Sequence, residues 1–410
     1  MSIYLIAILL ITVIDFVWLQ YLSYRNRRRM SPDIPSQLEG IYDKEDYAKQ
    51  QAYQKVNSRF GLYTSLVSFA ILLIALSLGL FGWLDEELRK YIDNEIILTL
   101  SFFGIIYVIN EIISLPLDYY ATFVIEERFG FNKSTKATFW LDQLKGLFLT
   151  IILGGGILAL IVWLYETLGE YAWLYAWGAV TLFSLFMTLF YSNIIVPLFN
   201  KQTPLEAGEL RDAIEAFASK AGFGLNNIYV MDASKRSSKA NAYFTGFGAK
   251  KRIVLFDTLI NDLDTDEIVA VLAHEIGHYK KKHTLQGMFV SILYTGVILF
   301  LLSWFLDNQE IATALGGQEP SFHLGMIAFS ILFTPISLII GIFSSVHSRK
   351  NEYQADAYAA GFSLAAPLIN GLKKLSVKSL SNLNPDPLYV FFHYSHPTLL
   401  QRMEALKKIK

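Results

Sequence analysis

Two histidines and a glutamate within residues 273–279 have the types and spacing of a hydrolytic metal site. His274 and His278 are four residues apart, so on a helix both imidazoles lie on one face and reach one cation. Glu275 is offset toward a water on the metal, where a carboxylate acts as a general base. The motif predicts one Zn²⁺ per chain and hydrolysis of peptide bonds. An ordinary amphipathic helix is the plain alternative, which the scarcity of histidine disfavours, with seven in 410 residues.

A third protein ligand must come from elsewhere in the chain. Cysteine is absent, so carboxylate or histidine must complete the site. Glu352 is the best candidate, and Asp356 shares its helical face four residues later. We expect Glu352 to bind the metal and Asp356 to accept the outer N–H of a ligand histidine. By themselves these two carboxylates would more often form a solvated helix face. For the charge that develops on the substrate carbonyl, His396 is the candidate donor, with His393 or Tyr394 as alternatives.

These residues must be positioned by a chain that is unusually apolar. Its composition is 53% hydrophobic and 15% aromatic, which places much of it in a lipid bilayer. The net charge of −1 gives no bulk electrostatic case for binding nucleic acid. Apolar runs of about 20 residues can each cross the hydrocarbon core. We expect seven such spans, at residues 3–22, 61–84, 96–117, 147–168, 171–198, 286–306 and 324–346. Two of them contain weak points, at Gly154–Gly155–Gly156 and at Pro335.

The basic residues alternate between the connecting segments. Residues 23–60 and the segment after the third span are rich in lysine and arginine, whereas the loops after the fourth and sixth spans carry only acidic charge. The positive-inside rule then places the N-terminus outside and the metal motif on the cytoplasmic side. The first span is expected to be a retained helix. The source membrane is expected to be a bacterial inner membrane or the endoplasmic reticulum, and the oligomeric state is not predicted.

The polar stretch 200–285 reads as a small mixed α and β domain. Helical periodicity covers 208–221, and strands are expected at 227–231, 239–247 and 252–256. Asp264 is a predicted N-cap for a helix that carries the metal motif through His283. His283 and His347 are expected at the surface or an interface. The predicted division is membrane helices 1–199, metalloprotease domain 200–285, membrane helices 286–346 and the remainder of the metalloprotease domain 347–410.

Taken together, the motifs resemble those of the integral-membrane type I CAAX prenyl endopeptidases over essentially the whole chain. The matching segments are His274–Glu275–Ile276–Gly277–His278, Glu352–Tyr353–Gln354–Ala355–Asp356 and Tyr394–Ser395–His396–Pro397. The resemblance implies a mainly α fold, in which seven transmembrane helices enclose a chamber under a small α+β, gluzincin-like zinc domain. It implies cleavage near the C-terminus of prenylated proteins.

The same resemblance implies roles for individual residues. His274, His278 and Glu352 would hold zinc, Glu275 would be the base, Asp356 an orienting group or proton donor, and His396 a stabiliser of the intermediate. Asn241, Ala242 and Tyr243 would pair with the substrate backbone like an added strand, and Arg402 would face the cleft.

Three other functions remain open at this point. The chain could degrade misfolded or stalled membrane polypeptides, with broader specificity. A site-2 type intramembrane protease fits less well, because Lys280, Lys281 and Lys282 beside the motif oppose its burial in lipid. A non-catalytic scaffold stapled by zinc would have no need of Glu275 beside the metal.

Overall fold

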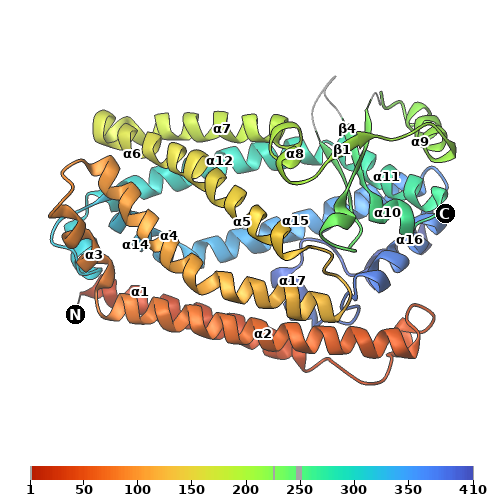
Figure 1. The fold of residues 1–410 in the computed structure, drawn as a ribbon, viewed down its shortest axis with the longest axis horizontal. Coiled ribbons are helices and arrows are strands. Elements are labelled where there is room, and N and C mark those ends of the chain that lie inside the picture. The colour runs from red at the N-terminus through yellow and green to blue at the C-terminus, as the bar shows by residue number, and fades with distance from the viewer. Residues whose placement is uncertain (1, 225–226, 246–251, 410) are drawn as a thin grey trace.

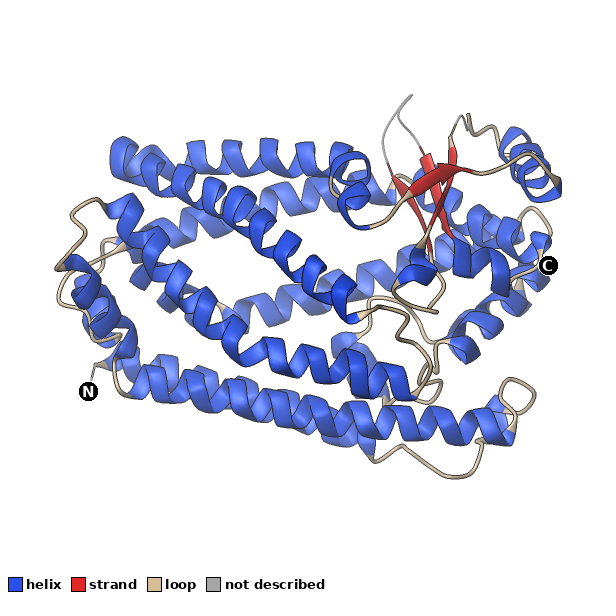
Figure 2. Ribbon diagram, in the orientation of Figure 1, coloured by secondary structure: helices blue, strands red, loops and turns tan. Residues whose placement is uncertain are grey.

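The computed structural model describes residues 2–224, 227–245 and 252–409. Long helices run roughly side by side through most of the molecule, and a small sheet with shorter helices occupies one end (Figure 1). The C-terminus lies at that end and the N-terminus at the opposite end. Figure 2 shows that the strands form one compact group in a mainly helical molecule.

The long apolar helices overlap the predicted spans, but Lys136–Leu149 lies almost wholly before the span predicted at 147–168, and the span predicted at 61–84 is broken after Ser77. These helices are α1 (Ile3–Arg27), α2 (Lys44–Ser77), α4 (Glu95–Tyr120), α5 (Lys136–Leu149), α6 (Gly156–Leu168), α7 (Ala172–Ile194), α12 (His283–Leu306), α14 (Phe322–Leu332) and α15 (Thr334–Ala360). By length and composition, five stretches of the described chain are able to cross a membrane, or six if α14 and α15 form one broken span. The run Lys136–Phe199 counts as one stretch of 64 residues in this reckoning. The number seven therefore stays a prediction.

Both predicted weak points are irregular in the structure. A π-helical segment, Thr150–Gly155, joins α5 to α6 where the glycine run begins. Helices α14 and α15 meet at 56° around Phe333, just before Pro335. Proline cannot donate a backbone hydrogen bond to the preceding turn, so the helix axis changes direction there.

The small domain is built on a four-stranded sheet in the order β1-β2-β4-β3. Its strands are β1 (Gln202–Pro204), β2 (Ile228–Met231), β3 (Ala242–Thr245) and β4 (Arg252–Phe256). The two runs predicted at 227–231 and 252–256 are β2 and β4, which pair in parallel. β3 pairs antiparallel with β4 and forms an edge of the sheet. The predicted strand 239–247 is confirmed over β3, and residues 246 and 247 lie outside the described chain. β1 was not predicted.

Helices α9 (Glu209–Lys220), α11 (Thr265–Lys280) and α16 (Ala365–Lys378) share one apolar core with the sheet. The predicted helix 208–221 is α9. Asp264 is the N-cap of α11, as predicted, and forms a capping box with Glu267. The prediction that this helix continues through His283 is wrong. Lys282 adopts a left-handed backbone (φ 61°), so α11 ends at Lys280 and α12 begins at His283.

Glycines hold the far end of the molecule together, where the turn between α2 and α3 (Leu80–Arg89) meets the segment after α13 (Gln309–Ala314). The Gly82 N–H donates to the Leu315 carbonyl at 2.9 Å. A Cβ added at Gly82 would stand 1.9 Å from the Gly316 carbonyl carbon. The two backbones therefore touch directly, which only glycine permits.

Shorter helices complete the described chain: α8 (Val196–Phe199), α10 (Asp257–Asp262), α17 (Pro387–His393), α18 (Leu399–Lys408), three 3₁₀ turns at Ser36–Leu38, Gly169–Tyr171 and Ala233–Lys235, and a π-helical turn at Ala121–Glu126. The predicted division at 346–347 falls inside α15, which continues unbroken from its apolar half into the small domain.

Candidate metal centre and catalytic cavity

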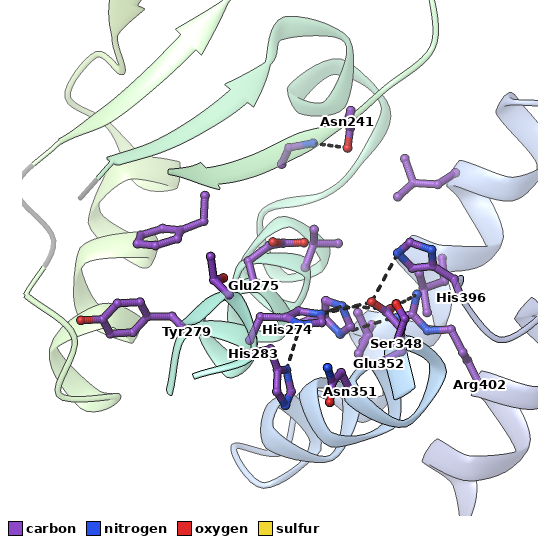
Figure 3. Close-up of a pocket in the computed structure, with 18 of the residues that line it drawn as sticks. Asn241, His274, Glu275, Tyr279, His283, Ser348, Asn351, Glu352, His396 and Arg402 are labelled. Atoms are coloured by element: carbon purple, nitrogen blue, oxygen red, sulfur yellow. Dashed lines mark hydrogen bonds and ion pairs between the residues drawn. The ribbon is translucent and has the colours of Figure 1, made fainter. Parts of the chain in front are cut away.

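Close packing of α11 against α15 brings the two halves of the metal motif together. A Cβ at Gly277 would stand only 3.1 Å from the Ala355 Cα and from the Tyr358 Cβ. Gly277 and the small Ala355 therefore allow the helix backbones to approach closely. His274 on α11 consequently lies beside Glu352 on α15 (Figure 3), and His278 approaches the same carboxylate.

The predicted ligands converge on one point. One atom each from His274, His278 and Glu352 lie within 4.8 Å of one another. The two Nε2 atoms are 3.1 Å apart, and the Glu352 carboxylate oxygens are 3.2 Å from His278 Nε2 and 3.4 Å from His274 Nε2. Two ligands at about 2.0–2.1 Å from a tetrahedral zinc ion are themselves about 3.3 Å apart, so this spacing suits the ion.

A buried carboxylate oxygen that accepts no hydrogen bond points the same way. Glu352 Oε2 is buried and accepts no hydrogen bond within the described chain, although His274 Nε2 lies 3.4 Å and Arg402 Nη1 3.6 Å away. Leaving such an oxygen unsatisfied is costly, whereas a cation would satisfy it. The donor set and this orphaned oxygen both fit zinc.

Asp356 lies behind His274, as the spacing predicted. Its side chain is 1% exposed, and Oδ1 is 2.8 Å from His274 Nδ1. Arg402 occupies the other side of the same carboxylate, with Nε 2.9 Å from Oδ2 and Nη2 2.6 Å from Oδ1. Both oxygens are thus committed, which supports an orienting role for Asp356 over a proton-donating one. Arg402 lines the cavity, and its guanidinium also lies 3.3 Å from His274 Nδ1 and 3.6 Å from Glu352 Oε2.

Burial shifts the pKa of the two neighbouring groups on α11 in opposite directions, yet both pKa values end above their ordinary ranges. Burial raises the pKa of Glu275 above the ordinary glutamate range, although His274 and His278 oppose this shift. Burial lowers the pKa of His274, but its hydrogen bonds with Asp356 and Glu352 prevail and raise that pKa to about 9 in the metal-free protein. Glu275 is therefore suited to exchange protons, and His274 holds a proton that zinc must displace.

A cavity of about 610 Å³ opens beside these residues. Its wall includes Glu275, the strand edge at Asn241 and Ala242, and His396. His396 is 63% exposed, and its Nε2 is 3.3 Å from Glu352 Oε1. The Tyr243 side chain faces away, with its hydroxyl 3.3 Å from Ser192 Oγ, because successive residues of a strand alternate sides.

His283 was expected at the surface or an interface, and the structure excludes the surface. The residue is 7% exposed and contacts both His278 and Gln354. His347, also expected outside the site, lines the cavity. Helical spacing missed His283 because the chain turns at Lys282, a position that carries no glycine to signal a left-handed residue.

Comparisons with known proteins agree with this geometry. Residues 204–410 match the model of peptidase family M48, and residues 23–201 match a model described as CAAX prenyl protease N-terminal, five membrane helices. CAAX prenyl protease 1 of Saccharomyces cerevisiae is 37% identical, over 96% of this chain and 93% of that protein. The CAAX prenyl protease 1 homolog of Homo sapiens is 31% identical, over 98% and 95% respectively.

A solved structure extends the likeness to three dimensions. The crystal structure of S. mikatae Ste24p matches with a TM-score of 0.94 at 35% identity, covering 99% of both chains. A match of this extent includes the membrane helices and the zinc domain alike. The chain therefore belongs to peptidase family M48 and is a multi-pass membrane zinc metalloendopeptidase of the CAAX prenyl protease type.

Proposed function

We propose that this protein hydrolyses peptide bonds near the C-terminus of prenylated CAAX proteins. The observation that carries the proposal is the match over almost the whole chain to CAAX prenyl protease 1, together with a metal cluster beside a free strand edge. Within the described residues, β3 pairs only with β4, so its outer edge is available to an extended peptide.

The proposed chemistry assigns one task to each residue. When bound by His274, His278 and Glu352, zinc lowers the pKa of a water and polarises the scissile carbonyl. Glu275 takes the proton of that water and later delivers it to the leaving amine.

His396 would stabilise the negative charge that develops on the carbonyl oxygen. Ser395 Oγ lies 2.9 Å from His396 Nδ1. If this hydroxyl donates to Nδ1, the proton of a neutral His396 resides on Nε2, the nitrogen nearer Glu352. His396 then donates from Nε2 into the cavity.

We further propose seven membrane crossings. The run Lys136–Phe199 reverses at Gly169, whose φ is 55°, and Val162 of α6 and Ala176 of α7 lie in one apolar core. This run would cross twice, and α14 with α15 once. The N-terminus would then be outside and the zinc site cytoplasmic.

The helices would enclose a chamber below the gluzincin-like domain. A second cavity, of about 280 Å³ between α7 and α12, shares Thr284 and Gly287 with the catalytic cavity. Its wall carries several hydroxyl side chains, including Ser184 and Ser291. Polar space would thus extend from the site into the helical region.

The test uses purified protein in detergent with a farnesylated CAAX peptide and its unprenylated counterpart. We expect chelator-sensitive cleavage that prefers the farnesylated peptide. Glu275→Gln should retain zinc and lose about 10²–10⁴-fold in rate. Undiminished turnover by this variant would disprove the mechanism. Zinc-loaded protein that cleaves neither peptide would instead favour a quality-control protease or a scaffold.

A further inference from the structure

His283, which also lines the cavity (Figure 3), contacts the metal ligand His278 through its Nδ1. The two Nδ1 atoms are 3.0 Å apart, and the imidazole rings meet nearly at right angles. On its other side, His283 Nε2 is 2.9 Å from the side-chain oxygen of Gln354. Both nitrogens of this buried imidazole are therefore engaged.

When metal is bound, only one placement of the protons on His278 and His283 satisfies these contacts. His278 presents Nε2 to Glu352 and His274, so this nitrogen must be free of a proton in order to bind zinc. A neutral His278 then carries its proton on Nδ1 and donates it. His283 Nδ1 is the acceptor, and its own proton resides on Nε2, where it is donated to Gln354 Oε1.

We propose that His283, held by Gln354, is the positioning residue that fixes the tautomer and ring orientation of His278 for metal binding. Asp356 has the corresponding role behind His274. There the partner is a carboxylate, whereas His278 is held by the neutral side chains of His283 and Gln354. This inference rests on the metal site of the proposed function and not on its substrate.

A short segment of α15, from Glu352 to Asp356, would then hold all three groups of the metal centre in place. Glu352 is the direct ligand, Gln354 acts through His283 on His278, and Asp356 hydrogen bonds to His274. These three side chains come from alternate positions of a single helix, so the ligand histidines on α11 are held from one rigid element.

The backbone before His283 supports a functional role. Lys282 adopts a left-handed conformation (φ 61°), which a residue with a Cβ rarely adopts. This turn starts α12 at His283 and brings its imidazole back toward α11. A straight continuation of α11 would not need such a residue.

The experiment measures zinc affinity by chelator competition and the visible spectrum of the cobalt-substituted full-length protein. In His283→Leu, His278 loses its acceptor, and we expect zinc affinity to fall about 10–100-fold with an altered cobalt spectrum. His283→Gln offers an oxygen to His278 and an amide N–H to Gln354, so it should restore affinity to within about threefold.

Gln354→Leu provides a second route should His283→Leu fail to fold, which thermal unfolding of the metal-free protein reports. It should weaken zinc binding by a smaller factor, because His283 still accepts from His278. The matched control is Gln286→Leu, an exposed glutamine outside the cavity lining, which should leave affinity unchanged.

Zinc affinity and a cobalt spectrum equal to those of the native protein in folded His283→Leu or Gln354→Leu would overturn the proposal. An equal loss of zinc affinity in His283→Leu and His283→Gln would also overturn it, since the volume of the side chain and not its hydrogen bonds would then determine zinc affinity. Failure to cleave CAAX peptides, with the predicted zinc pattern intact, would count against the proposed substrate alone.

Discussion

At the scale of single residues, the metal centre depends on how the outer nitrogens of its histidines are held. His274 is held by a carboxylate that Arg402 also contacts, whereas His278 is held by a neutral imidazole. A charged partner raises the basicity of a ligand histidine, and a neutral one does so less. The two ligand histidines should therefore differ in their sensitivity to substitution.

Asp356→Asn removes the charge that both His274 and Arg402 face. We expect zinc affinity to fall about 10–100-fold, because Arg402 then lies beside the cation without its main counter-charge. Chelator competition measures the change. Glu404→Gln, an exposed carboxylate on α18, is the control. Native affinity in Asp356→Asn would contradict the orienting role.

Zinc binding should also depend on pH through His274. Its pKa is about 9 in the metal-free protein, so below this pH zinc must displace a proton. Apparent affinity should therefore rise about tenfold per pH unit and level off near pH 9.

The stability of the metal-free fold should change with pH in the opposite direction to zinc affinity. A raised pKa stabilises the fold fully below the unfolded value of 6.5, and this contribution is lost as pH rises through about 9. Thermal unfolding of the metal-free protein checks this direction. Zinc affinity that does not vary from about pH 7 to about pH 9 would contradict the account.

At the scale of elements, the strand edge next to the metal is tied to the membrane helices. Lys239, two residues before Asn241, places Nζ 2.7 Å from Glu126 Oε2 and 3.0 Å from the Tyr53 hydroxyl. Arg236 forms a bidentate ion pair with Asp142 on α5, at 2.7 and 2.8 Å. The segment leading into β3 is thus held by three membrane-associated elements, which fixes the edge relative to Glu275.

Lys239→Met should loosen that edge. We expect KM for a peptide substrate to rise severalfold with a smaller change in kcat, since the strand contributes binding and not proton transfer. The cost in stability should be about 1 kcal/mol or less, because the ion pair is partly exposed. Steady-state kinetics tests this, with the exposed Lys235→Met as control. A fall in kcat alone would argue against a positioning role.

At the scale of the whole molecule, the catalytic end and the glycine contact lie at opposite ends (Figure 1). The far end also buries Asp85 and His323, whose Oδ1 and Nε2 are 2.7 Å apart. Stability of the helical region should therefore be separable from chemistry at the metal.

Gly82→Ala tests this separation. The added methyl cannot fit 1.9 Å from Gly316, so the two backbones must move apart, at a cost of about 1–3 kcal/mol. The midpoint temperature of thermal unfolding should fall while zinc affinity stays constant. Gly104→Ala, whose Cβ would meet no atom within 4 Å, is the matched control. Weakened zinc binding in Gly82→Ala would show that the two ends are coupled.

Local patterns in the sequence determined the helices and the motif they carry. The four-residue spacing of His274 and His278, the cap at Asp264 and the apolar runs all follow from periodicity within one helix. The strands β2 and β4 were equally readable, whereas the three-residue β1 exists only because β2 lies beside it.

Tertiary structure alone decided which side chains meet. Gly277 and Ala355 set the distance between α11 and α15, and this distance brings Glu352 to the histidines. The pairing of Arg402 with Asp356 and the return of His283 at Lys282 also join segments that no helical or strand period relates. Sequence periodicity reports contacts within an element, while contacts between elements depend on packing, which is settled only when the whole chain folds.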